Sequence, residues 1–322
     1  MATDDDMRLL VTGGTGFVGR SLLRWLAASG GALADLRPTL LTRDPAAFRA
    51  RHPALAARVE LLQGDVRGFA VPAAGFTHVL HGATDTSPQA HAHPEVIRET
   101  ILEGTRQVLE AAARVGAGRL LFLSSGAVYG PQPEGLEQLP ETYRGVLDPT
   151  DPGTSYGRAK LEAEALCEAW TDPGRSASVA RLFAFVGPDL PLDQHFAVGN
   201  FLRDALAGRP IEVKGDGTPV RSYLYQDDLA EWLWVLLRRG APGRAYNVGS
   251  DEAVDIATLA RLAAAVVHPG LEVRVARARA DYAGRHRYVP SLQRVRAELG
   301  LEVKVGLEEA LRRTALAHRG PQ

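Results

Sequence analysis

The sequence predicts an α/β fold with a doubly wound parallel sheet and a smaller C-terminal α/β region. Short apolar runs alternate with helical patterns over residues 1–187, which is typical of a parallel sheet with helices on both faces. A glycine-rich turn joins the first strand to the first helix, as in Rossmann-type domains. After residue 187 the alternation loosens, so we expect residues 188–322 to form mainly a substrate-binding region. Residues from about 221 to 250 are expected to complete the main sheet.

The glycine-rich turn lies within MRLLVTGGTGFVGR, residues 7–20. An apolar run at 9–11 predicts a strand, and leucines at helical spacing over 20–28 predict a helix. Glycine lets the backbone approach phosphate groups closely, and the free N–H groups at a helix N-terminus attract anions. The sequence therefore predicts a dinucleotide pyrophosphate site. We assign to it Gly13, Thr15, Gly16, Phe17, Val18 and Gly19.

The other elements of the first region follow in order. Strands are expected at 38–43, 59–65, 78–83, 119–125 and 178–187, and long helices at 94–115 and 154–170. The segment 131–152 is rich in proline and glycine and is expected to be a loop. In the second region we expect helices at 196–207, 228–237, 256–266, 291–299 and 307–317, and strands at 211–214, 221–225, 246–248 and 271–275.

Composition excludes several classes of protein. The 37 Lys+Arg residues nearly balance 38 Asp+Glu residues, so no basic surface argues for nucleic acid or for a membrane as a partner. The single cysteine, Cys167, leaves no internal disulfide and no cysteine-based metal site. No apolar run is long enough to span a bilayer, and the acidic N-terminus does not resemble a secretory signal. We therefore expect a cytoplasmic protein without a metal.

The end of the second strand, Thr42-Arg43-Asp44, bears on the choice of dinucleotide. An acidic side chain at this place favours the ribose 2′-hydroxyl of NAD, whereas an arginine favours the 2′-phosphate of NADP. Arg43 makes NADP the preferred cofactor, with NAD as the alternative. In the competing interpretation Arg43 is merely solvated and Asp44 caps the next helix.

Two further features lie where ligands bind in open α/β sheets. The strand 119–125 ends in Ser124 and Ser125 at the carboxyl edge of the sheet. Tyr156 and Lys160 are four residues apart in an expected helix, which places both side chains on one face. The two side chains are therefore close enough to act together.

These motifs together carry a family resemblance. The matching pieces, in order, are TGGTGFVG at 12–19, GD at 64–65, HGA at 81–83, SSGAVYG at 124–130, YGRAK at 156–160, GP at 187–188, KGDG at 214–217, residues 221–230 and NVGS at 247–250. The chain resembles the extended short-chain dehydrogenases/reductases of the nucleotide-sugar epimerase/dehydratase group. The resemblance spans about residues 7–250.

The resemblance implies roles for individual residues. Ser125, Tyr156 and Lys160 would be catalytic, with Tyr156 moving a proton while a hydride passes between the sugar and the nicotinamide. Lys160 would also hold the nicotinamide ribose. Further cofactor contacts would come from Asp65, Val66, His81, Gly82 and Ala83. Substrate contacts would come from Ser124, Ser125, Asn200 and Arg221, the last gripping the diphosphate.

The chain departs from the pattern of its group at informative places. Sugar dehydratases of the group carry an Asp-Glu pair after the active-site Ser/Thr, where this chain has Gly126 and Ala127. Dehydration is therefore disfavoured. Ala184 and Ile101 replace asparagines that are frequent in relatives, so the geometry of substrate binding is expected to differ.

The leading hypothesis is an NAD(P)-dependent enzyme that transfers a hydride at a ring carbon of a nucleotide-diphosphate sugar. Reduction of a 4-keto sugar and epimerisation are equally compatible with the motifs, although Arg43 favours reduction. A dehydratase or a decarboxylase of the same group, a ketone reductase and a non-catalytic dinucleotide sensor are the alternatives. The resemblance also implies a homodimer that pairs through the helices 94–115 and 154–170.

Overall fold

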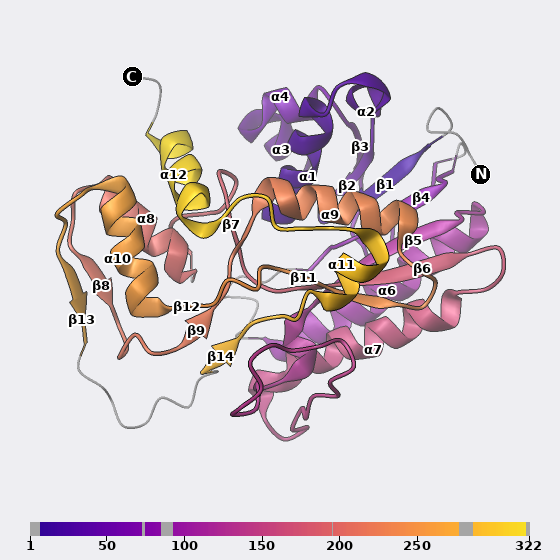
Figure 1. Cartoon of the computed structure of the whole chain (residues 1–322). Helices are drawn as coiled ribbons and strands as arrows, with labels where there is room; N and C mark the ends of the chain where they lie inside the picture. Colours follow the sequence, from indigo (N-terminus) through magenta and orange to yellow (C-terminus); the bar gives the residue numbers. More distant parts are fainter. Residues whose placement is uncertain (1–6, 73–74, 85–92, 195, 277–285, 320–322) are drawn as a thin grey trace. The chain divides into compact units, whose positions relative to one another are not determined.

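The computed structural model describes residues 7–72, 75–84, 93–194, 196–276 and 286–319, and the chain forms two compact units (Figure 1). The first unit comprises Met1–Val128, Leu147–Leu182 and Ala230–Tyr246. The second comprises Tyr129–Val146, Phe183–Leu229 and Asn247–Gln322. These units are defined by their contacts, and the functional division expected at residue 187 stays a prediction.

The main sheet has seven strands in the order β11-β6-β5-β4-β1-β2-β3. Their bounds are β1 Leu9–Thr12, β2 Thr39–Thr42, β3 Glu60–Gln63, β4 His78–His81, β5 Arg119–Ser125, β6 Ser176–Leu182 and β11 Ala245–Val248. All neighbours from β6 to β3 pair in parallel, which confirms the expected fold class. The strand order reverses between β1 and β4, and such a switch point is where open α/β sheets bind ligands.

Helices flank this sheet, with α6 and α7 side by side on one face and α1 and α9 on the other (Figure 1). Their bounds are α1 Phe17–Ala28, α2 Gly31–Asp35, α3 Pro45–Arg51, α4 Pro53–Ala56, α6 Pro94–Arg114, α7 Ser155–Trp170 and α9 Gln226–Arg239, with short 3₁₀ turns η2 Gly126–Tyr129 and η3 Pro152–Thr154. The Asp44 carboxylate accepts a hydrogen bond from the backbone N–H of Ala47 at 2.9 Å, which confirms that Asp44 caps α3.

The core of the first unit lies between the sheet and the α6–α7 pair. The central strands are buried almost completely, as expected for a parallel sheet covered on both faces. The indole Nε1–H of Trp170 donates to the carbonyl of Leu109 at 3.0 Å and links α7 to α6. Cys167 is fully buried in the same cluster, and burial raises the pKa of its thiol. The thiol is therefore a packed, protonated group.

The second unit holds three small sheets, with strand orders β10-β7, β12-β9-β14 and β13-β8. The strands are β7 Phe185–Val186, β8 Ile211–Val213, β9 Val220–Arg221, β10 Leu224–Tyr225, β12 Val254–Asp255, β13 Val273–Val275 and β14 Arg287–Tyr288. The helices are α8 Ala197–Leu206, α10 Ile256–Val267, α11 Gln293–Leu299 and α12 Leu307–His318. The α10 helix packs against both α8 and α12.

Two strands expected from the sequence are each divided in the structure. The expected strand 178–187 ends with β6 at Leu182, and β7 then pairs with β10 in a different sheet. The expected strand 221–225 is likewise divided between β9 and β10, which pair with different partners. Gly187 directly follows β7, and it must be a glycine because a Cβ there would lie 2.4 Å from Oε1 of Gln226. Apolar runs reveal extended segments but not their pairing partners.

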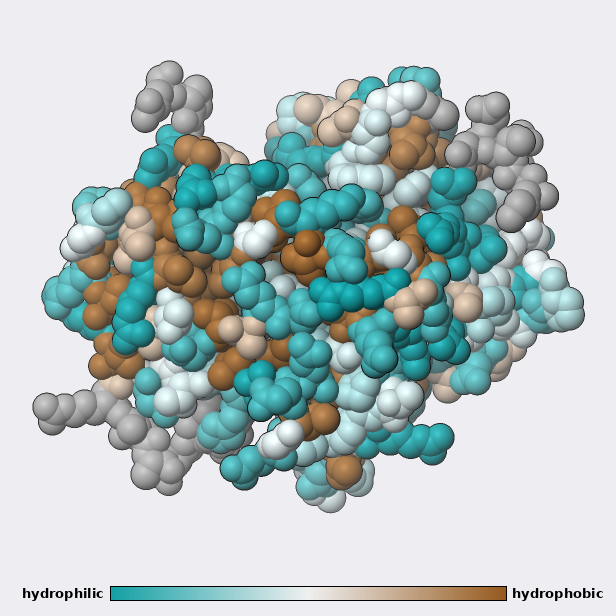
Figure 2. Space-filling model, viewed as in Figure 1, coloured by the Kyte–Doolittle hydropathy of each residue, from teal (hydrophilic) through white to brown (hydrophobic). Residues whose placement is uncertain are grey.

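Hydrophilic residues cover much of the visible face, and hydrophobic residues appear there in separate patches (Figure 2). Large hydrophobic side chains that are exposed in the described residues are Val96, Val146, Leu161, Val275 and Leu316. None of the helices in the described part of the chain combines the length and the apolar character needed to cross a membrane.

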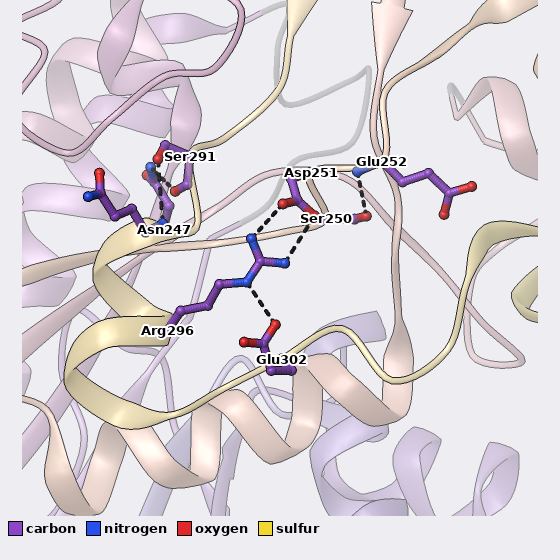
Figure 3. A network of polar contacts seen from close by, with 8 residues as sticks. Asn247, Ser250, Asp251, Glu252, Ser291, Arg296 and Glu302 are labelled. Atoms are coloured by element: carbon purple, nitrogen blue, oxygen red, sulfur yellow. Dashed lines mark hydrogen bonds and ion pairs between the residues drawn. The ribbon is translucent and has the colours of Figure 1, made fainter.

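A polar network links the segment after β11 to α11 within the second unit (Figure 3). Arg296 of α11 donates to Asp251 at 2.6 Å and to Glu302 at 2.7 Å, so one guanidinium holds two chain segments. The side-chain amide of Asn247 donates to the carbonyls of Leu139 and Ser291. The NVGS motif at 247–250 therefore has a clear structural role in this unit.

Candidate active site

The glycine turn between β1 and α1 is shaped by two close backbone approaches. Gly13 has φ +75°, and a Cβ there would lie 2.5 Å from the backbone of Gly82. A Cβ on Gly19 would lie 2.2 Å from Cα of Gly14. Gly16 is exposed at the N-cap of α1, where no side chain caps the helix. The first N–H groups of α1 therefore have no capping side chain, as an anion site at a helix N-terminus requires.

The segment after β4 packs against this glycine turn. The hydroxyl of Thr12 accepts the N–H groups of Gly82 and Ala83, each at 3.2 Å, and lies 2.7 Å from Nδ1 of His81. Nε2 of the same ring lies 3.1 Å from the hydroxyl of Thr105. Thus the predicted cofactor residues His81, Gly82 and Ala83 are joined to β1 by one hydroxyl.

The proton positions in this bridge follow from the donor and acceptor counts. The hydroxyl of Thr105 donates to the carbonyl of Ile101 at 2.6 Å, so it must accept from Nε2–H of His81. Nδ1 then accepts the hydroxyl proton of Thr12. Burial, helped by the charge of Lys160, lowers the pKa of His81 to about 3, which keeps the ring neutral.

The carboxyl ends of β2 and β3 carry the residues predicted to contact the adenosine. Arg43 is exposed, while Asp44 is engaged in capping α3. Asp65 accepts two hydrogen bonds from the guanidinium of Arg67, at 2.9 and 3.3 Å, and these hold the pKa of Asp65 below its usual range. Val66 is buried in the core of the first unit. The structure thus places charged side chains of both signs where the adenosine is expected.

Tyr156 and Lys160 lie on one face of α7. The ammonium of Lys160 lies 5.9 Å from the centre of the Tyr156 ring, and Lys160 is only 3% exposed. Gly157 lets α7 approach η2 closely, since a Cβ there would lie 2.5 Å from the carbonyl oxygen of Ala127. The Ser125 hydroxyl, at the end of β5, accepts the N–H of Ala127 at 3.1 Å. Its own proton remains available to donate elsewhere.

The ammonium of Lys160 is fixed by two neutral acceptors. It donates to the carbonyl of Leu123 at 2.8 Å and to the hydroxyl of Thr84 at 3.1 Å, and it lies 4.8 Å from the centre of the Phe122 ring. Burial lowers the pKa of Lys160 to about 7, and electrostatic interactions with Cys167 and Glu164 act in the opposite direction. The side chain is therefore poised to change its charge near neutrality.

The sequence did not single out Thr84 or Glu164, although both bear on this site. Thr84 directly follows the predicted cofactor segment and could have been found by extending it by one residue. Glu164 is four residues after Lys160, the spacing that also relates Lys160 to Tyr156. Ser124 donates its hydroxyl proton to Glu164 at 2.5 Å and is 2% exposed, so its hydrogen bond is made inside the first unit.

Two predicted substrate residues belong to the second unit. Asn200 is in α8, and its side-chain carbonyl accepts from Arg203 at 3.0 Å. Arg221 is in β9, is half-buried and donates to the carbonyl of Val220 at 2.8 Å. Their roles toward a substrate stay predictions. Among the residues described, no group of three or more His, Cys, Asp or Glu side chains could hold a metal ion.

The parallel sheet and the close-packed glycine turn at its switch point are the features of a Rossmann-type fold. The model of the NAD dependent epimerase/dehydratase family matches residues 9–249. The chain therefore belongs to the NAD-dependent epimerase/dehydratase family, and the resemblance to the extended short-chain dehydrogenases/reductases that modify nucleotide sugars is confirmed.

Individual relatives are similar to this chain over nearly its whole length. UDP-glucuronic acid decarboxylase 1 of Xenopus tropicalis is 31% identical over 316 residues, which are 98% of this chain and 72% of that protein. UDP-glucose 4-epimerase of Thermus thermophilus, in complex with NAD, is 28% identical with a TM-score of 0.78 and covers 98% of this chain and 99% of its own. RMD from Pseudomonas aeruginosa, complexed with NADPH, is 27% identical with a TM-score of 0.78 and covers 97% and 99%.

Proposed function

We propose that this chain is an NAD(P)-dependent enzyme that transfers a hydride at a ring carbon of a nucleotide-diphosphate sugar. The observation that carries the proposal is the buried ammonium of Lys160, held by Leu123 and Thr84 beside the ring of Tyr156. Among the described residues, no carboxylate is in direct contact with this ammonium, and such a buried lysine is costly to maintain, so its presence argues for a chemical role.

Each side chain of the proposed site has its own role in the reaction. Tyr156 passes a proton to or from the sugar oxygen, and the nearby ammonium of Lys160 stabilises its phenolate form. Ser125 donates a hydrogen bond to the same sugar oxygen, since its hydroxyl proton is not used by Ala127. The dinucleotide, when bound, supplies or accepts the hydride that balances this proton. Gly13, Gly16 and Gly19 leave the space for its phosphates.

NADP is the preferred cofactor in this proposal. Asp44 is occupied at the start of α3, so Arg43 is the charged side chain at the end of β2 that remains available for a phosphate. The two solved relatives differ in this respect, since one is in complex with NAD and the other with NADPH.

Reduction of a 4-keto sugar and epimerisation remain the two leading reactions. Gly126 and Ala127 provide neither an acid nor a base after Ser125, which argues against dehydration. Decarboxylation is the second candidate function, because the curated relatives at 30–31% identity are named UDP-glucuronic acid decarboxylases. That reaction, too, begins with oxidation at the sugar C4.

The first test is the identity of the nucleotide released when the purified protein is denatured, read by mass spectrometry. A stoichiometric NAD(H) would favour a recycled cofactor, as in epimerisation or decarboxylation, and would contradict the NADP preference. An empty protein that binds NADPH tightly and NADH weakly would favour reduction. A panel of nucleotide sugars that includes UDP-glucuronic acid and 4-keto sugars then identifies the reaction.

Replacement of Tyr156 by phenylalanine separates an enzyme from a dinucleotide sensor. We expect turnover to fall by about 10²–10⁴-fold, because the proton-transfer group is removed while the ring remains. Cofactor affinity, measured by fluorescence titration, should stay within about threefold, since a phenyl ring preserves the packing. Tyr143→Phe, the same change outside the proposed site, is the matched control. Full activity in Tyr156→Phe would contradict the assignment.

The homodimer expected through α6 and α7 is also a proposal. Val96 on α6 is 48% exposed and Leu161 on α7 is 44% exposed, so both helices present apolar side chains on their outer surfaces. A two-fold arrangement is the commonest form of oligomer, and sedimentation measures it directly.

A further inference from the structure

A buried ion pair lies one helical turn beyond Lys160 in the first unit. Glu164 of α7 accepts from Nη2 of Arg181 at 2.7 Å and from Nε at 3.1 Å, and Arg181 is in β6. The two side chains are only 9% and 12% exposed. Ser124 of β5 completes the set by donating to Glu164 at 2.5 Å. One carboxylate thus connects α7 to two adjacent strands.

This carboxylate continues a line of side chains along α7. Tyr156, Lys160 and Glu164 are spaced by four residues, which places them on one face of the helix. Ser124 and Leu123 are neighbours in β5, so the strand that receives the ammonium of Lys160 is also bonded to Glu164. A shift of α7 along the sheet would break both contacts together.

Titratable or charged groups from three elements face Lys160. His81 comes from β4, and Tyr156, Glu164 and Cys167 come from α7. Arg181 comes from β6 and lies behind Glu164. His81 is neutral because its pKa is lowered to about 3, and the thiol of Cys167 is neutral because burial raises its pKa. Glu164 is therefore the carboxylate of this set, and the two hydrogen-bond acceptors of Lys160, the carbonyl of Leu123 and the hydroxyl of Thr84, are uncharged.

We propose that Glu164 is a positioning residue of the active site: held by Arg181 and Ser124, it increases the proportion of Lys160 in the ammonium form that Tyr156 requires. Burial by itself favours the neutral amine, and an opposite charge nearby counters that preference. Burying an unpaired carboxylate is costly, and the guanidinium of Arg181 supplies the opposite charge in direct contact with Glu164. The inference rests on the proposed function, because the charge of Lys160 matters through Tyr156.

Nuclear magnetic resonance can test this without a substrate. The chain has only three lysines, at positions 160, 214 and 304, so labelling of the lysine ε-carbons gives three signals. Lys214→Arg and Lys304→Arg assign them. In the wild type we expect the Lys160 signal to titrate near pH 7. Glu164→Gln retains the shape of the side chain and should lower this midpoint by about one pH unit.

Glu168→Gln, the same change at an exposed position of α7, is the matched control and should leave the midpoint unchanged. An unchanged Lys160 midpoint in folded Glu164→Gln overturns the proposal, and so does an equal fall in both variants. If Glu164→Gln does not fold, the double variant Glu164→Met, Arg181→Met replaces it, because no unpaired charge is then buried. We expect the Lys160 midpoint to fall in this double variant as well, and an unchanged midpoint again overturns the proposal. Because no substrate is used, the outcome is independent of the reaction assigned to the enzyme.

Discussion

His81, at the end of β4, has both ring nitrogens engaged in a buried bridge. Its Nδ1 accepts from Thr12, and its Nε2–H donates to Thr105. The same Thr12 hydroxyl receives the N–H groups of Gly82 and Ala83, so the tautomer of one histidine bears on the segment predicted to line the cofactor phosphates. A protonated ring would lose the acceptor that Thr12 uses, and the bridge requires the neutral form.

Stability should therefore depend on pH through this residue. An unfolded histidine titrates near ~6.5, whereas folding lowers the pKa of His81 to about 3. Between these values the unfolded chain binds a proton that the folded chain does not, so the contribution of His81 is lost as the pH falls from ~6.5 toward 3. The free energy of unfolding should fall by about 1.4 kcal/mol per pH unit in that window.

His81→Gln supplies an acceptor and a donor but does not titrate, so it isolates this effect from that of the carboxylates. Urea unfolding of both proteins between about pH 7 and about pH 5 is the measurement. We expect the wild type to lose stability more steeply than the variant as the pH falls. Parallel pH dependences of the two proteins would show that His81 is not held neutral.

The glycines of the turn between β1 and α1 differ in whether the fold itself requires them. Gly13 and Gly19 are needed by the fold, since a Cβ at either would meet backbone atoms at 2.5 Å and 2.2 Å. Gly16 differs, because its φ is −78° and the nearest atom to a Cβ there is 3.4 Å away. Among the described residues, nothing demands glycine at position 16. Open space beside this helix N-terminus is what the predicted phosphate site requires.

Alanine substitutions should separate these requirements. Gly16→Ala should cost less than about 1 kcal/mol of stability, yet weaken NADP(H) or NAD(H) binding by about tenfold or more, because the methyl group occupies the phosphate side. Gly19→Ala should instead destabilise the protein by about 1–3 kcal/mol through overpacking against Gly14. Thermal unfolding and cofactor titration of the same samples give both quantities. Undiminished cofactor affinity in Gly16→Ala would place the pyrophosphate elsewhere.

The sequence predicts those parts of each element that depend on local spacing. The glycine turn, the end of β5 and the Tyr156–Lys160 face of α7 are local patterns, and the structure places them as expected. The partners of these elements are not local. Arg181 is 17 residues from Glu164, and its contact with Glu164 depends on how β6 lies against α7. The division of 178–187 between β6 and β7 likewise depends on their partners, because β6 pairs with β5 and β7 pairs with β10, which no periodicity indicates.

At the scale of the molecule, the two units are interleaved along the chain. The first takes most of α9 and the start of β11 from Ala230–Tyr246, and the second begins with Tyr129–Val146, inside the predicted dinucleotide region. Proposed cofactor residues such as Gly16 and Lys160 belong to the first unit, whereas Asn200 and Arg221 belong to the second. A continuous fragment of the chain therefore could not carry either unit whole.

The proposed cofactor residues and substrate residues lie in different units. Hydrogen–deuterium exchange of the intact protein should therefore show protection by the cofactor in the first unit and protection by a substrate fragment in the second. NADPH alone should slow exchange in peptides that cover the glycine turn, Gly82–Ala83 and the start of α7, because new contacts suppress local opening. UDP, as a nucleoside diphosphate without sugar, should slow exchange in α8 and around β9. Lys304→Arg, a conservative change remote from these roles, should reproduce the wild-type pattern. Protection of first-unit peptides alone by UDP would contradict the proposed roles of Asn200 and Arg221, while leaving the cofactor site intact.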